Sequence, residues 1–195
     1  MSDQQLTEVL DKHAISDVIM AYARALDRLD EAMLRSVFHS DSQHAHGFIG
    51  PSSDPSLPSK PGEPGDFVAY ALEVLNTHTR TQHQLGNIFI ELEGSDAYVE
   101  TYFTAYHRMR AKGDPKAAEN AHDTEMDFFV GGRYLDRFQK RDGVWKISHR
   151  TGLSDWMRTE PPATQGFFDI PSELLGHRGK KDLVYRRREE FKSAP

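Results

Sequence analysis

The chain has 195 residues, a formal net charge of −6 and no cysteine, which fits one domain without disulfides, thiolate nucleophiles or cysteine-ligated metal. The acidic balance argues against nucleic acid as a partner, because non-specific binding neutralises phosphates with Lys and Arg. Residues 1–10 lack the apolar run of a signal peptide, and no stretch has the roughly 20 apolar residues that cross a membrane, so we expect a cytoplasmic protein with no membrane partner.

The first part of the chain carries a helical pattern. Apolar residues recur at spacings of three and four between Ile15 and Leu29, which is typical of one face of an amphipathic helix. Asp30 stands where a second, short helix would begin, over residues 31–38, and its side chain suits both the cap and the positive helix end. A short strand over residues 43–49 is expected next.

The middle of the chain marks a change from helices to strands. Proline, glycine and serine dominate residues 50–65, which predicts a surface loop, with an inserted flap as the alternative. Asp66 then caps a third helix that runs to about Asn76. Beyond it the apolar pattern alternates with period two, and we expect four strands, over residues 79–93, 97–110, 125–139 and 144–156. Helices followed by a meander of strands indicate an α+β fold.

The segment after Trp156 differs in composition from the rest. Prolines interrupt it, an apolar Phe167-Phe168 pair follows, and a last helix is expected over residues 180–191. We therefore divide the chain into a main domain over residues 1–157 and a tail over residues 158–195. The tail could close over a pocket or pack on a neighbouring subunit, and the sequence leaves both open.

Two histidines on expected strands are candidates for acid–base chemistry. Alternation places His83 and His107 on mainly apolar faces, where a buried imidazole needs a partner and its pKa becomes tunable. On spacing alone each is better explained as a structural histidine of the core. The same alternation predicts that His78 and His83 lie on opposite faces. Asp27 lies off the apolar stripe of the first helix, so periodicity places it near solvent unless the helix ends there.

The sequence gives little support for a metal or a cofactor. His44 and His46 share one face of a strand and could bind a metal together, but no third ligand stands at a firm spacing. The glycine fingerprints of dinucleotide and phosphate sites, the HExxH helix and the GxSxG elbow do not occur. We therefore expect no cofactor and no metal.

Four segments in order carry a resemblance to a known family. Residues 79–87 (TRTQHQLGN), 100–107 (ETYFTAYH), 132–138 (GRYLDRF) and 143–150 (GVWKISHR), the last continuing to Asp155-Trp156, resemble successive strands of SnoaL-like proteins in the nuclear-transport-factor-2-like superfamily. The likeness covers about residues 6–157. It implies a cone in which helices pack in the concave face of a curved antiparallel sheet, and a homo-oligomer, either dimer or trimer.

The resemblance also implies an activity and the residues that carry it. The lyases of the superfamily, dehydratases and dehydrochlorinases among them, need no cofactor and use an Asp–His dyad, whose positions fall on Asp27 and His83. A second catalytic histidine falls on His107 and a tyrosine on Tyr22, whereas the asparagine of some members has no secure match. These four residues are the expected catalytic set.

The sequence thus leads to a working hypothesis about function. We expect elimination from a hydroxylated aromatic or polycyclic small molecule, with loss of water or a retro-aldol-type loss of formaldehyde. A non-catalytic binding or assembly module is the alternative, as is an isomerase or cyclase that uses the same dyad. The expected substrate-binding residues are Phe48, Leu85, Phe103, Phe128, Arg133, Tyr134 and Trp156.

Overall fold

The computed structural model describes residues 2–46, 66–163 and 170–193, so Phe48 and the expected loop at 50–65 lie outside the described residues. The elements in chain order are α1 (Asp3–Arg28), α2 (Glu31–Ser36), β1 (Phe38–His46), α3 (Phe67–Asn76), β2 (His78–Glu93), β3 (Asp96–Met109), β4 (Met126–Arg141), β5 (Val144–Glu160), the 3₁₀ turns η1 (Ser172–Leu174) and η2 (Gly179–Lys181), and α4 (Leu183–Ser193). The predicted order of helices and strands is confirmed.

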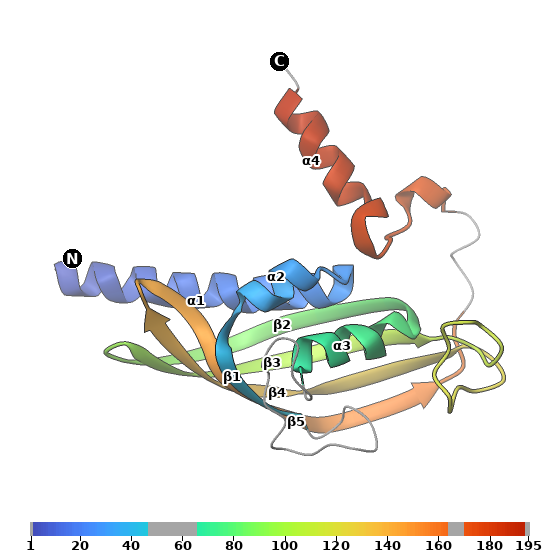
Figure 1. Cartoon of the computed structure of the whole chain (residues 1–195), viewed down its shortest axis with the longest axis horizontal. Helices are drawn as coiled ribbons and strands as arrows, with labels where there is room; N and C mark the ends of the chain where they lie inside the picture. The colour runs from blue at the N-terminus through green and yellow to red at the C-terminus, as the bar shows by residue number, and fades with distance from the viewer. Residues whose placement is uncertain (1, 47–65, 164–169, 194–195) are drawn as a thin grey trace.

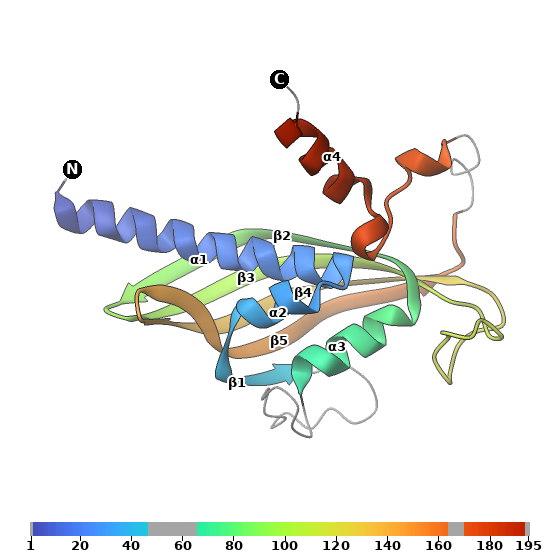
Figure 2. The same ribbon diagram turned by 45° about the horizontal axis from the view of Figure 1, so that its top comes forward.

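The five strands form one curved, open sheet in the order β1-β5-β4-β3-β2. Neighbouring strands from β2 to β5 run antiparallel, as expected, whereas β1 pairs with β5 in parallel. The sheet is therefore mixed, although a wholly antiparallel sheet was expected. Helices α1, α2 and α3 lie together over one face of the sheet (Figures 1 and 2). This α+β arrangement confirms the predicted fold class.

The helix α1 begins earlier than its apolar stripe. Ser2 and Gln5 form a reciprocal capping box, which satisfies free N–H groups and starts the helix at Asp3. Only the later turns bury side chains against the sheet, through Ile15, Ile19, Tyr22 and Leu26. The helix ends in Leu29, whose φ of 51° is left-handed, and the side chain of Asp30 then accepts from the backbone N–H of Met33 to begin α2.

Below Tyr22 the core contains a buried ion pair. The guanidinium of Arg150 donates to both carboxylate oxygens of Asp136 at 2.7 and 2.6 Å, and neither side chain has any exposed surface. The guanidinium carbon also lies 4.0 Å from the ring centre of Tyr22 and 4.2 Å from that of Tyr134. The pair therefore holds two aromatic rings in place beneath the helical layer.

Three of the register shifts in the sheet bear on which face the expected site residues and their neighbours occupy. The register of β2 shifts between His78 and Arg80 and again between Gly86 and Ile88, where Asn87 has a φ of 47°. In β5 the register shifts where Gly131 and Gly132 pair with Trp156 and Ser154, which leaves Asp155 unpaired. Because side chains alternate with period two, each extra residue moves the following side chains to the other face.

Gly132 provides a test of how closely β4 and β5 pack. A Cβ on this residue would lie 1.9 Å from the carbonyl oxygen of Leu153, which belongs to the backbone and cannot rotate away. Gly132→Ala should therefore lower the free energy of unfolding by about 1–3 kcal/mol or more, measured by urea denaturation. Gly86→Ala is the matched control, since a Cβ added at Gly86 would meet no atom within 4 Å. Equal losses of unfolding free energy in both variants would contradict the close approach of β4 and β5 at Gly132.

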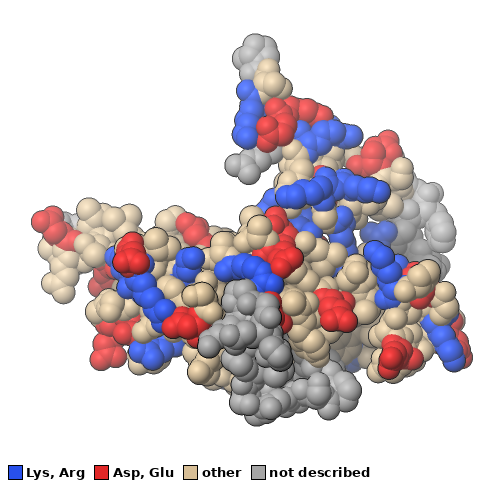
Figure 3. All heavy atoms as spheres, in the orientation of Figure 1, with Lys and Arg blue, Asp and Glu red and all other residues tan. Residues whose placement is uncertain are grey.

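The outer face of the sheet carries half-exposed aromatic side chains between ion pairs. Phe89, Tyr98, Tyr102 and Trp156 are between 44% and 59% exposed. On the molecular face in Figure 3, acidic and basic side chains are interspersed rather than separated.

The expected homo-oligomer, dimer or trimer, remains a prediction. Among the described residues, no helix combines the length and apolar character needed to cross a membrane.

Candidate active site

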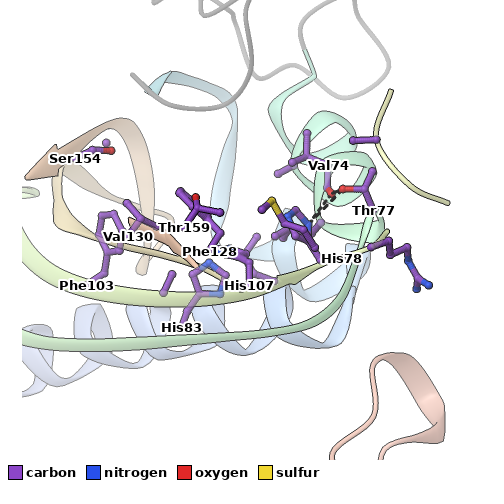
Figure 4. Close-up of a pocket in the computed structure, with 18 of the residues that line it drawn as sticks. Val74, Thr77, His78, His83, Phe103, His107, Phe128, Val130, Ser154 and Thr159 are labelled. Carbon is purple, nitrogen blue, oxygen red and sulfur yellow. Dashed lines mark hydrogen bonds between the residues drawn. The ribbon is translucent and has the colours of Figure 1, made fainter. Parts of the chain in front are cut away.

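A cavity of about 450 Å³ opens between the helical layer and the inner face of the sheet (Figure 4). Its walls are mainly apolar and include Leu26, Phe67, Phe103, Met109, Phe128 and Val130. Three histidines from two strands, His78, His83 and His107, line the same space. Their rings are neighbours, with centroid distances of 5.2 Å from His107 to His78 and 5.3 Å from His107 to His83.

Asp27 and His83 form the central contact of this site. An oxygen of the Asp27 carboxylate lies 2.8 Å from Nδ1 of His83, and the two side chains are only 13% and 6% exposed. The carboxylate also accepts from the backbone N–H of His83 and from the hydroxyl of Thr81, both at 2.9 Å. The structure thus brings together the two residues that the resemblance had paired.

The position of Asp27 follows from the end of its helix. Asp27 belongs to the last turn of α1, and its carboxylate contacts the part of β2 that begins at Thr81. Helical periodicity alone predicted that Asp27 is exposed to solvent. That prediction is wrong, because β2 packs on the last turn of α1 and covers Asp27 although it lies off the apolar stripe. Burial would raise the pKa of Asp27, but the hydrogen bonds from His83 and Thr81 outweigh it and lower the pKa.

The contact fixes the tautomer of His83. An ionised carboxylate can only accept, so the proton between the two residues belongs to Nδ1 of the imidazole. In the neutral ring Nε2 then carries the free lone pair, which makes it the nitrogen able to take a proton. The carboxylate can also stabilise the imidazolium that forms afterwards.

His107 and His78 differ electrostatically from a histidine in water. Burial, helped by His83, His78 and Arg178, holds the pKa of His107 well below its usual value. Burial and the charge of Arg178 lower the pKa of His78 to about 4, although a contact of 3.0 Å between its Nδ1 and the carbonyl oxygen of Val74 acts in the opposite direction. Both imidazoles are therefore neutral near pH 7.

The depressed pKa of His78 predicts an acid-sensitive fold. Between the unfolded value of 6.5 and the folded value of about 4, the unfolded chain binds a proton that the folded chain does not. The free energy of unfolding should therefore be unaffected by this histidine above about pH 6.5 and should fall by about 2–3 kcal/mol as the pH approaches 4. Urea denaturation at several pH values between these limits measures how steeply the free energy of unfolding depends on pH. His78→Gln should flatten the slope, whereas His13→Gln, at a side chain 71% exposed, should leave it unchanged.

Tyr22 and Tyr134 form the floor of the cavity. Tyr22 is 2% exposed and Tyr134 is 4% exposed, and their rings meet edge to face at 5.6 Å. The ring of Phe103 stacks on Tyr134 at 4.4 Å. Burial raises the pKa of both tyrosines, so their hydroxyls keep their protons and can donate. Of the expected substrate contacts, Phe103, Phe128 and Tyr134 line the cavity.

Other expected contacts lie elsewhere. Leu85 packs against the core without lining the cavity. Arg133 pairs with Glu100 and Asp155 outside the cavity, because it alternates with the inward residues of β4. Trp156 is 49% exposed, and its ring occupies the space where a Cβ of Gly131 would stand. Arg133 and Trp156 therefore do not line this cavity, the latter because of the bulge at Asp155.

Two further histidines, His44 and His78, were considered in the sequence, and the position of His78 differs from expectation. His44 is 3% exposed and its ring stacks on Phe67 at 4.0 Å, and the described residues contain no group of three potential metal ligands. His78 shares the cavity with His83, because the bulge after it reverses the alternation that predicted opposite faces. Sequence reasoning also missed the polar lining residues Thr77, Arg110, Asn120 and His122, which no local pattern marks.

The fold and the cavity together define a class of protein. Helices cover one face of a curved sheet, and a buried Asp–His pair faces the space between them. The profile of the SnoaL-like domain matches residues 7–151. The chain therefore belongs to the SnoaL-like family, and the resemblance seen in the sequence is confirmed.

Solved structures share the fold at low sequence identity. A hexachlorocyclohexane dehydrochlorinase, LinA type 2, is 19% identical with a TM-score of 0.63, over 83% of this chain and 99% of that one. A protein from Kribbella flavida, Kfla4162, is 16% identical with a TM-score of 0.62, over 77% and 95%. A predicted scytalone dehydratase from Novosphingobium aromaticivorans is 22% identical with a TM-score of 0.58, over 83% and 99%. A comparison with curated proteins finds no match.

Proposed function

We propose that this protein is a cofactor-independent lyase that eliminates water or formaldehyde from a hydroxylated aromatic or polycyclic small molecule. The observation that carries the proposal is the 2.8 Å contact between Asp27 and Nδ1 of His83 beside a largely apolar cavity. A binding module has no need of a buried carboxylate that fixes an imidazole tautomer. Two proteins of the same fold are named for related eliminations, the dehydrochlorinase and the predicted dehydratase.

The proposed dehydration needs one base and returns its proton. Nε2 of His83 takes a proton from a substrate carbon, while Asp27 stabilises the imidazolium. The electron pair of the C–H bond becomes a double bond as the neighbouring C–O bond breaks. The departing oxygen takes the proton from His83 and leaves as water, so atoms and charge balance. In the formaldehyde variant His83 takes the hydroxyl proton, the C–C bond breaks, and the aromatic carbon receives the proton.

His107 and Tyr22 have supporting roles in this proposal. Because the pKa of His107 is low, its neutral ring supplies a hydrogen bond to a developing enolate rather than a full proton. Tyr22 keeps its hydroxyl proton and can donate a hydrogen bond from the cavity floor. The aromatic walls, Phe67, Phe103 and Phe128, suit a flat apolar ligand and exclude water from the reacting atoms.

A panel of hydroxylated aromatic and polycyclic carbon acids, incubated with the full chain in D₂O, tests the proposal. NMR and mass spectrometry would detect loss of water or formaldehyde, and exchange of a carbon-bound hydrogen would report the base even without elimination. His83→Ala should slow both elimination and exchange by about 10²–10⁴-fold. Saturable binding without exchange or elimination would favour the binding module, and a product of unchanged mass would favour an isomerase or cyclase.

A further inference from the structure

The C-terminal segment 170–193 returns to the main domain beside the catalytic pair. It lies beyond residue 151, where the family profile ends. Residues around η2 meet the end of α1, while α4 extends away from the sheet (Figures 1 and 2). Arg178 immediately precedes η2, and its side chain donates hydrogen bonds to backbone carbonyls of the main domain.

The guanidinium of Arg178 donates to three backbone carbonyls from three elements. It contacts the carbonyl of Leu26 in α1 at 3.3 Å, that of His78 in β2 at 3.2 Å and that of Leu75 in α3. Carbonyls in the last turn of a helix carry partial negative charge, so those of Leu26 and Leu75 favour a cation. Leu26 directly precedes Asp27, and His78 begins the strand that carries His83.

Other contacts hold this segment against α1. Asp182 is 6% exposed, lies 3.6 Å from Nε of Arg28, and accepts from the backbone N–H groups of His177 and Val184 at 3.0 Å. Lys180 lies 3.8 Å from Asp30. Lys180 and Asp182 thus contact α1 just after Arg178, and the hydrogen bond from His177 to Asp182 closes the turn that carries Arg178.

The charge of Arg178 acts on the site as well. Burial lowers its pKa to about 10, so it remains a cation at neutral pH, and the carboxylate of Asp27 supports that charge. The titratable groups that lower the pKa of His78 are Arg178 and Arg110, and those that lower the pKa of His107 are His83, His78 and Arg178. Arg178 is thus the cation common to both neutral imidazoles.

We propose that Arg178 is a positioning residue of the acid–base site, which ties the end of α1 to the start of β2 and so holds Asp27 against His83. The inference rests on the function proposed above for that pair. It makes residues 170–193 part of the site rather than an appendage. Arg178 touches no reacting atom, and it acts through the backbone next to Asp27 and through its charge.

Histidine-labelled full-length protein studied by NMR provides the test, and it needs no substrate. One readout is the Nδ1 proton of His83, hydrogen-bonded to Asp27, and the other is the titration midpoint of His78. Arg178→Gln removes the charge, whereas Arg178→Lys keeps it but cannot reach three carbonyls at once. Arg187→Ala is the control, since Arg187 is 56% exposed on the same segment and pairs with Glu190 within α4.

In Arg178→Gln we expect an upward shift of the His78 midpoint and a shifted or weakened His83 signal. Arg178→Lys should perturb the His83 signal while the His78 midpoint stays near that of the wild type. Unchanged His83 and His78 signals in Arg178→Gln would overturn the proposal, as would a lower melting temperature without a change in the His83 signal. Absence of lyase turnover alone would contradict only the proposed function.

Discussion

Replacing His83 by alanine should lower kcat/KM for the elimination by about 10²–10⁴-fold, the typical contribution of a positioned general base. The side chain is 6% exposed and Asp27 fixes its tautomer, so alanine at this position leaves Asp27 without the imidazole that takes the proton. The loss should fall on kcat rather than KM, because Nε2 acts on the reacting proton. Steady-state kinetics on a substrate from the D₂O panel measures it.

Asp27→Asn should cause a loss of similar order, because an amide can donate to Nδ1 and stabilise the wrong tautomer of His83. Gln84→Ala is the matched control for both variants, since Gln84 is exposed and alternates with His83 along β2. Substitutions at His83 and Asp27 that leave turnover within a factor of two or so of the control would rule out the dyad.

Asp136→Asn should lower the free energy of unfolding by about 3–5 kcal/mol, because it leaves the guanidinium of Arg150 buried without its counter-charge. The two side chains have no exposed surface, so water cannot replace the lost partner. Urea denaturation at pH 7, followed by tryptophan fluorescence, measures the effect. Since Arg150 lies between Tyr22 and Tyr134, the floor of the cavity should loosen in the same variant.

An exposed pair of the same chemistry provides the control. Asp41 is 57% exposed and lies 2.8 Å from Arg141, so Asp41→Asn should cost less than about 1 kcal/mol. Replacing both buried partners, with Asp136→Leu and Arg150→Met, should recover much of the loss, because it removes the uncompensated charge. Equal effects of Asp136→Asn and Asp41→Asn would contradict the assigned role of the buried pair.

The helices and strands were predictable because their signals are local. Asp30 and Asp66 cap the helices that they were expected to begin, and alternation located the inward face of β3, including Phe103 and His107. The early start of α1 depends on a capping box at Ser2, which the search for an apolar stripe overlooked. The parallel pairing of β1 with β5 depends on contacts distant in sequence.

The errors about the site have one main cause. Each bulge adds a residue to a strand and reverses the alternation beyond it, and no single sequence pattern marks where it occurs. The bulges at positions 79 and 155 therefore placed His78 in the cavity and moved Trp156 out of it. Asp27 was located by resemblance and not by periodicity, because burial of the last helical turn depends on β2.

The left-handed cap at Leu29, which fixes where α1 ends, restricts the insertions and deletions that this helix can accept during evolution. A residue inserted or deleted between Tyr22 and Asp27 would rotate the carboxylate by about 100° around the helix axis and move it by about 1.5 Å, away from the imidazole. The number of residues from the cavity floor to the cap is therefore restricted by chemistry. Length changes are better tolerated at the solvent end of α1, where Leu6, Val9 and Leu10 are exposed and the helix can be extended or shortened without turning the acid.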